Sequence, residues 1–117
     1  MLVTRLKKVP SVFYQTKEGA RPVREFILGL PQEDRRIIGN DIATVEYGWP
    51  IGKPTCAPLG LGLWEVRSNL RSNRIACVIF TLHADRMWLL HGFIKKTQKT
   101  PQGDIDLARK RKKEVKK

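Results

Sequence analysis

The stretch LWEVRSNLRSNRIACVIFTLHADRMWLLHGFIK, residues 63–95, decides the fold class of this chain. It holds three apolar runs with the length and composition of β-strands, at residues 63–70, 74–82 and 86–95. The connectors RSN and HADR are short enough for hairpins, so neighbouring strands should pair antiparallel. The sequence therefore predicts an antiparallel sheet built from three consecutive strands.

The three predicted strands differ in how they distribute polar side chains. The middle run is apolar at nearly every position, which is typical of a strand covered on both faces. The first run alternates, with Trp64 and Val66 on one side and charged residues on the other. If helices cover one face of the sheet, the other face is free, and polar strand residues then line a basic concave surface. These residues are Glu65, Arg67, Arg74, His91 and Lys95.

The first half of the chain is expected to hold one strand and two helices. Residues 11–15 alternate as a short strand does. A first helix begins at Pro22, and one apolar stripe follows it, made of Val23, Phe26, Ile27 and Leu30. A second helix begins at Pro31, has acidic residues in its first turn, and ends before Gly48, with Gly48 and Pro50 beyond its end.

Two further segments complete the predicted fold. Residues 48–62 carry three prolines among four glycines, which no helix or central strand tolerates, so we expect a crossing loop. A basic C-terminal helix follows over about residues 101–117, with Thr100 as N-cap and Pro101 as its first residue. The fold class is α+β: a twisted, mostly antiparallel sheet of one N-terminal and three C-terminal strands, two N-terminal helices on one face, and a C-terminal helix.

Length and composition suit one small domain. The chain has 117 residues, of which 41% are apolar, enough for one core over residues 1–117. It lacks a membrane-length apolar run and a secretory signal pattern, which predicts a cytoplasmic protein. The two cysteines, Cys56 and Cys77, form no CxxC pair, so we expect neither a disulfide nor a zinc site.

The positive charge lies in the second half of the chain. The net charge is +12, and residues 51–117 hold 15 Lys and Arg against 5 Asp and Glu. Such asymmetry indicates a nucleic-acid partner, because each neutralised phosphate releases counterions. The alternative interpretation is a solubility device or a disordered basic tail.

The motifs present narrow the chemistry. Nucleotide-cradling glycine loops and serine or cysteine nucleophile signatures are missing from the sequence. The carboxylates of the second half are scattered, so we expect no catalytic metal and no cofactor. Metal-independent cleavage of RNA remains, in which the 2′-hydroxyl is the nucleophile. It requires a proton acceptor, a proton donor and cations that stabilise the phosphorane, and arginine, lysine and histidine can supply all three.

Several segments taken together resemble a known family. The order RPVREFILGLP, LGLGLWEVRS, RIACVIF, LLHGFIKKTQKTP and DIDLARKR is similar to the HigB-like branch of the RelE/ParE toxin superfamily, often described as phage-derived. The likeness covers about residues 9–112. It implies a ribosome-dependent mRNA interferase that binds mRNA and ribosomal RNA and is neutralised by a helix-turn-helix antitoxin. It also implies a twisted antiparallel sheet carrying two N-terminal helices.

The resemblance also suggests roles for individual residues. Arg67 and Arg74 resemble the arginines that grip the scissile phosphate in RelE-type toxins, and Lys95 resembles a basic residue that holds substrate. We expect these three cations to be catalytic residues and to converge on one phosphate-sized pocket. The predicted RNA-binding residues are Lys96, Lys99, Arg71 and Lys110.

The proton acceptor stays open at this point. Superfamily members place a tyrosine or histidine near the C-terminus, whereas here the last tyrosine is Tyr47 and the last histidine is His91. Histidine titrates near neutral pH, which favours His91 as a catalytic residue. A lysine among other cations is the alternative.

Each of these interpretations has a competitor. Arg67 and Arg74 can be surface residues in weak ion pairs, and His91 can be a hydrogen-bonded core residue. At the level of function, the competitors are a basic RNA- or ribosome-binding module without catalysis and a gyrase-inhibiting toxin of the ParE kind.

Overall fold

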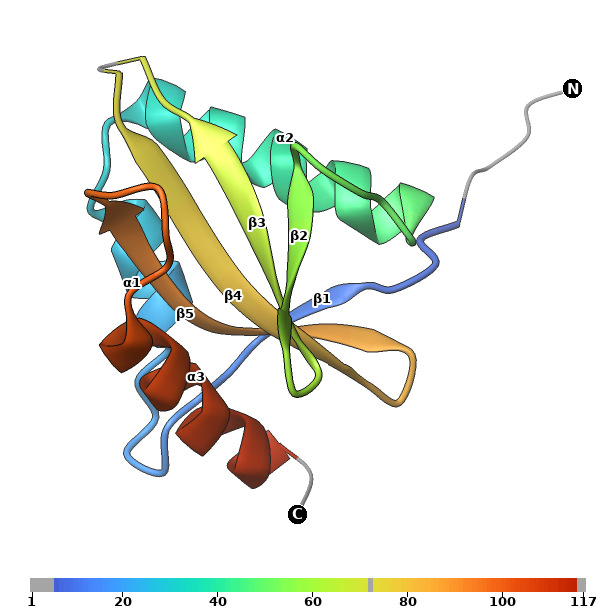
Figure 1. Ribbon diagram of the computed structural model, residues 1–117. Coiled ribbons are helices and arrows are strands. Elements are labelled where there is room, and N and C mark those ends of the chain that lie inside the picture. Colours follow the sequence, from blue (N-terminus) through green and yellow to red (C-terminus); the bar gives the residue numbers. More distant parts are fainter. Residues whose placement is uncertain (1–5, 72, 116–117) are drawn as a thin grey trace, which may run out of the picture.

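The computed structural model describes residues 6–71 and 73–115 and has an α+β fold. Within these residues, five strands form one sheet and three helices pack against it. The elements run in the order β1 (Ser11–Phe13), α1 (Pro22–Leu28), α2 (Gln32–Gly48), β2 (Cys56–Gly60), β3 (Leu63–Asn69), β4 (Ile75–His83), β5 (Arg86–Lys95) and α3 (Gln102–Val115) (Figure 1).

The three consecutive strands form the antiparallel sheet that the sequence predicts. The strand order is β1-β5-β4-β3-β2, with β1 parallel to β5 and the other neighbours antiparallel. β4 lies in the middle, which explains why it is apolar on both faces. The β4–β5 hairpin turns through Ala84 and Asp85, whose φ angles of 53° and 59° are left-handed, as a two-residue turn requires.

The predicted crossing loop is wrong in part, because it contains β2. This strand pairs antiparallel with β3 and places Cys56 opposite Val66 and Pro58 opposite Trp64. β2 is the outer strand of the sheet, so the missing N–H group of Pro58 interrupts no ladder on its free side. The proline content excludes a central strand but not an edge strand.

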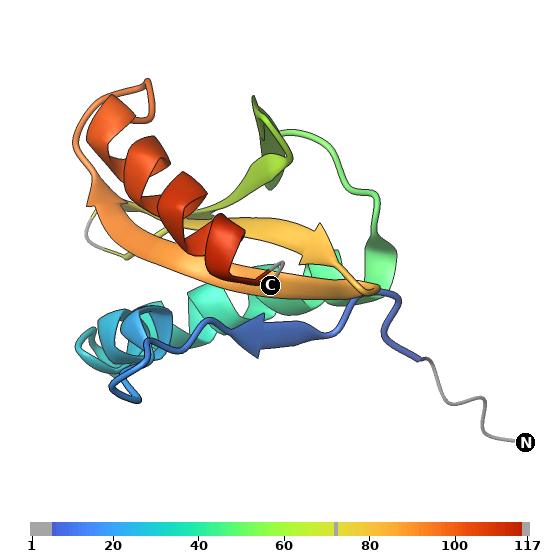
Figure 2. The same cartoon turned by 90° about the horizontal axis from the view of Figure 1, so that it is seen from below.

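The helices lie on both faces of the sheet. α1 and α2 pack on one face and α3 packs on the other (Figure 2). The larger core lies under α1 and α2, where Ile38, Val78 and Phe80 are completely or almost completely buried. A smaller core lies under α3, where Ile79 and Ala108 are fully buried. The expectation of one free face is therefore wrong, because α3 covers part of it.

One glycine allows the close approach of α1 to the sheet. A Cβ atom on Gly92 would lie 2.6 Å from Cδ2 of Phe26. Only a residue without a side chain therefore lets the Phe26 ring rest on β5. In the HGF sequence of this strand, residues 91–93, the glycine is therefore required for the packing of α1.

The start of α3 also differs from the prediction. The helix begins at Gln102, and its first backbone bond runs from the Ile105 N–H to the Pro101 carbonyl. Thr100 lies two residues before the helix and does not cap it; its hydroxyl donates a 2.6 Å hydrogen bond to Glu65 Oε2 and accepts one from Lys95 Nζ. None of the helices in the described part of the chain is both long and apolar enough to cross a bilayer.

Candidate functional site

Three of the predicted catalytic residues lie on the face of the sheet that α3 partly covers. We call this surface the α3-side face and define it by Arg67, Cys77, His91, Phe93 and Lys95. Arg67, Cys77 and Phe93 stand side by side on β3, β4 and β5. The backbones of Arg67 and Phe93, which lie on either side of Cys77, are therefore roughly 10 Å apart. This row separates His91 from Lys95 along β5.

Lys95 belongs to a buried polar cluster and not to the exposed surface. Its Nζ lies 3.4 Å from Glu65 Oε1 and donates a 3.2 Å hydrogen bond to the Thr100 hydroxyl. The Lys95 and Glu65 side chains are only 2% and 4% exposed. A buried ammonium with an ion partner is held in place and does not face an incoming phosphate. Lys95 instead fixes the connection between β5 and α3.

Arg71 and Arg74 extend toward the other side of the sheet. Arg74 Nη2 lies 3.5 Å from Oδ2 of Asp34, whose side chain is 5% exposed. Arg71 Nε lies 3.1 Å from Glu33 Oε2, and the Arg71 N–H donates to Asp34 Oδ1. Both arginines therefore tie the β3–β4 connection to the first turn of α2. The expected convergence of Arg67, Arg74 and Lys95 on one pocket is not found.

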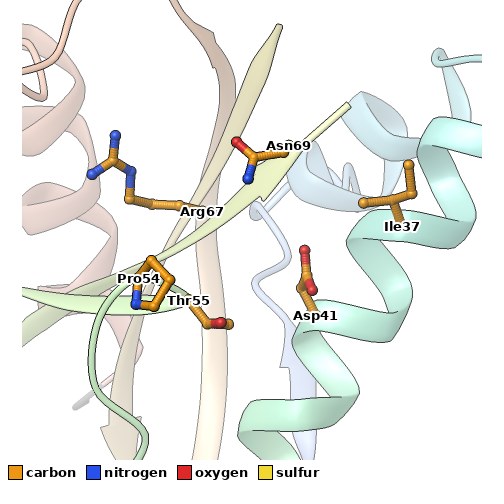
Figure 3. A pocket seen from close by; sticks show the side chains of 6 residues that line it. All are labelled: Ile37, Asp41, Pro54, Thr55, Arg67 and Asn69. Carbon is orange, nitrogen blue, oxygen red and sulfur yellow. The ribbon is translucent and has the colours of Figure 1, made fainter. Parts of the chain in front are cut away.

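The guanidinium of Arg67 is not tied to another part of the fold in this way. Among the described residues, no side chain forms a hydrogen bond or ion pair with it. Arg67 extends from β3 away from α2, whereas Ile37 and Asp41 come from α2 (Figure 3). Arg67 borders a cavity of about 400 Å³. A half-buried guanidinium without a protein partner is available to bind an external anion.

His91 is paired with a carboxylate at the start of α3. His91 Nε2 lies 2.6 Å from Asp104 Oδ1, and the side chains are 16% and 25% exposed. The imidazole ring stacks on Phe93, with ring centres 5.4 Å apart. In the tautomer whose Nε2–H donates a hydrogen bond to Asp104 Oδ1, Nδ1 keeps its lone pair. In that tautomer, Nδ1 is the ring nitrogen that can accept a proton.

The two cysteines are unsuited to act as nucleophiles. Burial raises the pKa of Cys77 to about 12, and the nearby Glu65 carboxylate adds to the effect. Burial likewise raises the pKa of Cys56 to about 11. Both thiols are therefore protonated at neutral pH. Among the described residues, no group of three or more His, Cys, Asp or Glu side chains is arranged to hold a metal ion.

The remaining predicted RNA-binding residues lie on the surface. Lys96 and Lys99 are exposed in the connection between β5 and α3. Lys110 is exposed on α3 and borders a cavity together with Tyr14 and Glu114. Its neighbour Arg111 is committed to the fold, because Nη1 donates a 2.7 Å hydrogen bond to the Leu90 carbonyl.

Two carboxylates near the predicted site residues were not predicted from the sequence: Asp104 beside His91, and Asp41 in the cavity that Arg67 lines. Asp104 carries only the signal of an acidic residue in a first helical turn, and nothing in its spacing from His91 reveals the contact. Asp41 looks like a solvated residue of an amphipathic helix, yet it lines the cavity beside Arg67. In both cases the docking of a helix on the sheet creates the site.

The arrangement of helices and strands places this protein in a known fold class. Two N-terminal helices on one face of a twisted α+β sheet form the RelE-like fold. Residues 25–113 match the family described as Phage derived protein Gp49-like (DUF891), and the chain belongs to that family. The family is associated with toxins of the RelE and HigB type. A search of curated proteins finds no significant match to the chain.

Proposed function

We propose that this protein is the toxin of a toxin–antitoxin pair and an endoribonuclease that cuts mRNA on the ribosome without a metal ion. Membership of the Gp49-like family supports the toxin part of the proposal. The observation that carries the enzymatic part is the Arg67 guanidinium, which has no partner among the described residues and lies on the α3-side face that also bears the His91–Asp104 pair.

The chemistry follows from the available groups. His91 Nδ1 removes the proton of the RNA 2′-hydroxyl, and Asp104 stabilises the imidazolium that forms. The 2′-oxygen attacks the adjacent phosphate, and Arg67 stabilises the negative charge of the phosphorane. The bond to the 5′-oxygen then breaks, and this oxygen takes a proton from water or from an ammonium group nearby. The products are a 2′,3′-cyclic phosphate and a 5′-hydroxyl end.

The other predicted residues support this centre in different ways. Lys96, Lys99 and Lys110 are exposed cations that we assign to phosphates of mRNA and ribosomal RNA. Arg71, whose side chain is 73% exposed, joins them at the far end of β3. Lys95 and Arg74 contribute through the fold, by their contacts with Glu65 and Asp34. The partners are therefore the ribosome in the cytoplasm and a neutralising helix-turn-helix antitoxin.

The test uses purified ribosomes carrying a defined mRNA. The proposal predicts new 5′-hydroxyl ends within the message, which polynucleotide kinase can label directly. A metal-dependent nuclease in which water attacks the phosphate and the 3′-oxygen leaves gives 5′-phosphate ends instead. Block of translation without any cleavage would indicate a non-catalytic ribosome-binding module. A loss of DNA supercoiling with intact RNA would indicate a gyrase-inhibiting toxin.

A further inference from the structure

A cavity of about 400 Å³ opens between α2 and the outer part of β3 (Figure 3). Its lining residues come from α2, from the segment before β2, and from β3: Ile37, Asp41, Pro54, Thr55, Arg67 and Asn69. The four polar side chains of this lining make no hydrogen bond or ion pair with any described residue. A cavity on which a few polar side chains converge beside apolar ones is a candidate binding site.

The backbone of β3 adds hydrogen-bonding groups to the cavity. The Arg67 N–H donates a 2.8 Å hydrogen bond to the Thr55 carbonyl, just before β2 begins at Cys56. Asn69 is two residues further along, so its N–H and C=O point to the same side as those of Arg67. No described strand lies beside β3 at that point. A ligand in the cavity therefore meets an open strand edge.

The carboxylate of Asp41 determines which chemical group fits. It is half-buried and is not neutralised by an ion pair with any described residue. A carboxylate repels a phosphate and only accepts hydrogen bonds, so the group that fits beside it is a hydrogen-bond donor. In a bound nucleotide, the phosphate therefore contacts Arg67, and the base contacts Asp41.

We propose that this cavity holds a guanine base of single-stranded RNA, next to the phosphate bound by Arg67. Guanine presents two adjacent donors, N1–H and N2–H₂, which match the two oxygens of one carboxylate. The other three bases present a single donor group beside acceptors on that edge. The Asn69 side-chain amide can donate to O6, and Ile37 and Pro54 supply apolar walls for the ring faces.

This inference rests on the proposed function for its choice of RNA, and its first test does not require cleavage. Short 2′-O-methyl RNAs that differ only in the central base are titrated against the full-length protein at fixed salt. The RNA with guanine should bind about tenfold more tightly than the other three, and Asp41→Asn should abolish the difference. Equal binding of all four RNAs by the wild-type protein would overturn the inference. Guanosine monophosphate competing as well as the guanine-containing RNA would overturn the assignment to RNA.

The matched control is Asp85→Asn, which makes the same chemical change at the β4–β5 turn. Asp85 lies beyond the opposite end of β4, roughly 25 Å along the strand from the cavity. This variant should keep the full preference for guanine. Asp41 forms no hydrogen bond or ion pair with a described residue. Asp41→Asn therefore breaks no such contact and should leave the melting temperature unchanged. Asn69→Ala is a second variant that should weaken the preference by a smaller factor.

The second test maps the cleavage sites in mRNA. Wild-type protein should cut with guanine enriched at one fixed position relative to the broken bond, and Asp41→Asn should lose that enrichment while it still cuts. An unchanged sequence pattern in Asp41→Asn would contradict the inference. If the wild-type protein cuts no RNA, the proposed enzymatic function fails, and the binding test alone decides the guanine site.

Discussion

Lys95 Nζ lies 3.4 Å from Glu65 Oε1, and both side chains are almost completely removed from solvent. The two residues stand on β5 and β3, so the contact spans the central strand β4. Thr100 closes the cluster by hydrogen bonds to both. The contact anchors the segment that carries Lys96 and Lys99. The first lysine of the KKTQK sequence therefore positions the exposed ones.

Removal of one member of this cluster should destabilise the protein strongly. Glu65→Leu leaves the Lys95 ammonium buried without a counter-ion, and we expect a loss of about 3 to 5 kcal/mol in the free energy of unfolding. The double variant Glu65→Leu with Lys95→Met should recover most of this loss. Arg71→Ala, which breaks the exposed pair with Glu33, is the control and should cost about 0 to 1 kcal/mol. Urea denaturation measures all four proteins.

Loss of the histidine's partner should reduce catalysis without loss of substrate binding. Asp104→Asn no longer favours the Nε2–H form of His91, so kcat should fall by about 100-fold or more, with KM little changed. Because the two residues act as a unit, the double variant with His91→Gln should be no slower than His91→Gln alone. Asp106→Asn changes a carboxylate that accepts a hydrogen bond from Gln102 and should leave kcat unchanged. Additive losses would show that His91 and Asp104 act separately.

The buried thiols predict a loss of stability in alkali. Burial raises the pKa of Cys56 and Cys77 from 9.0 to about 11 and about 12. The unfolded chain therefore loses these protons at a lower pH than the folded protein. The free energy of unfolding should fall as the pH rises from about 9 toward 12. Denaturation across this range should give a shallower pH slope for Cys77→Ala than for the wild type, and equal slopes would contradict the account.

The contact between Gly92 and Phe26 predicts a steric effect. Gly92→Ala places a methyl group 2.6 Å from the Phe26 ring, so α1 must shift and stability should fall by about 1 to 3 kcal/mol. A smaller side chain at position 26, as in Phe26→Leu, should reduce the cost of the added methyl group. Gly103→Ala has nothing within 4 Å of its new Cβ and should not destabilise the protein. Thermal melts of the single and double variants test this.

Local patterns were sufficient to predict most of the sheet. The strand predicted at residues 86–95 coincides with β5, because its apolar run ends at a short hairpin on one side and at polar residues on the other. β2 was not predicted, since its pairing depends on a partner, β3, that lies beyond a turn with left-handed backbone at Leu61. Proline marks where a central strand cannot lie, and it does not distinguish an edge strand from a loop.

The candidate site was predictable only in part. Arg67 and His91 follow from strand alternation, which fixes the face to which each side chain points. Arg74 precedes β4, so its direction is set by the buried Asp34 carboxylate of α2 and not by alternation. Asp41 and Asp104 reach the site through the docking of α2 and α3. Such contacts depend on tertiary packing and leave no local pattern.

The most direct test of the central claim is a map of 5′-hydroxyl mRNA ends after induced expression of wild type, Arg67→Ala and Arg86→Ala. Arg86 is exposed at the β4–β5 turn and serves as the matched control. We predict new ends within messages for the wild type and Arg86→Ala, and at least about a tenfold loss for Arg67→Ala at unchanged thermal stability. Cleavage by Arg67→Ala at the wild-type level, or growth arrest by the wild type without new RNA ends, would contradict the account.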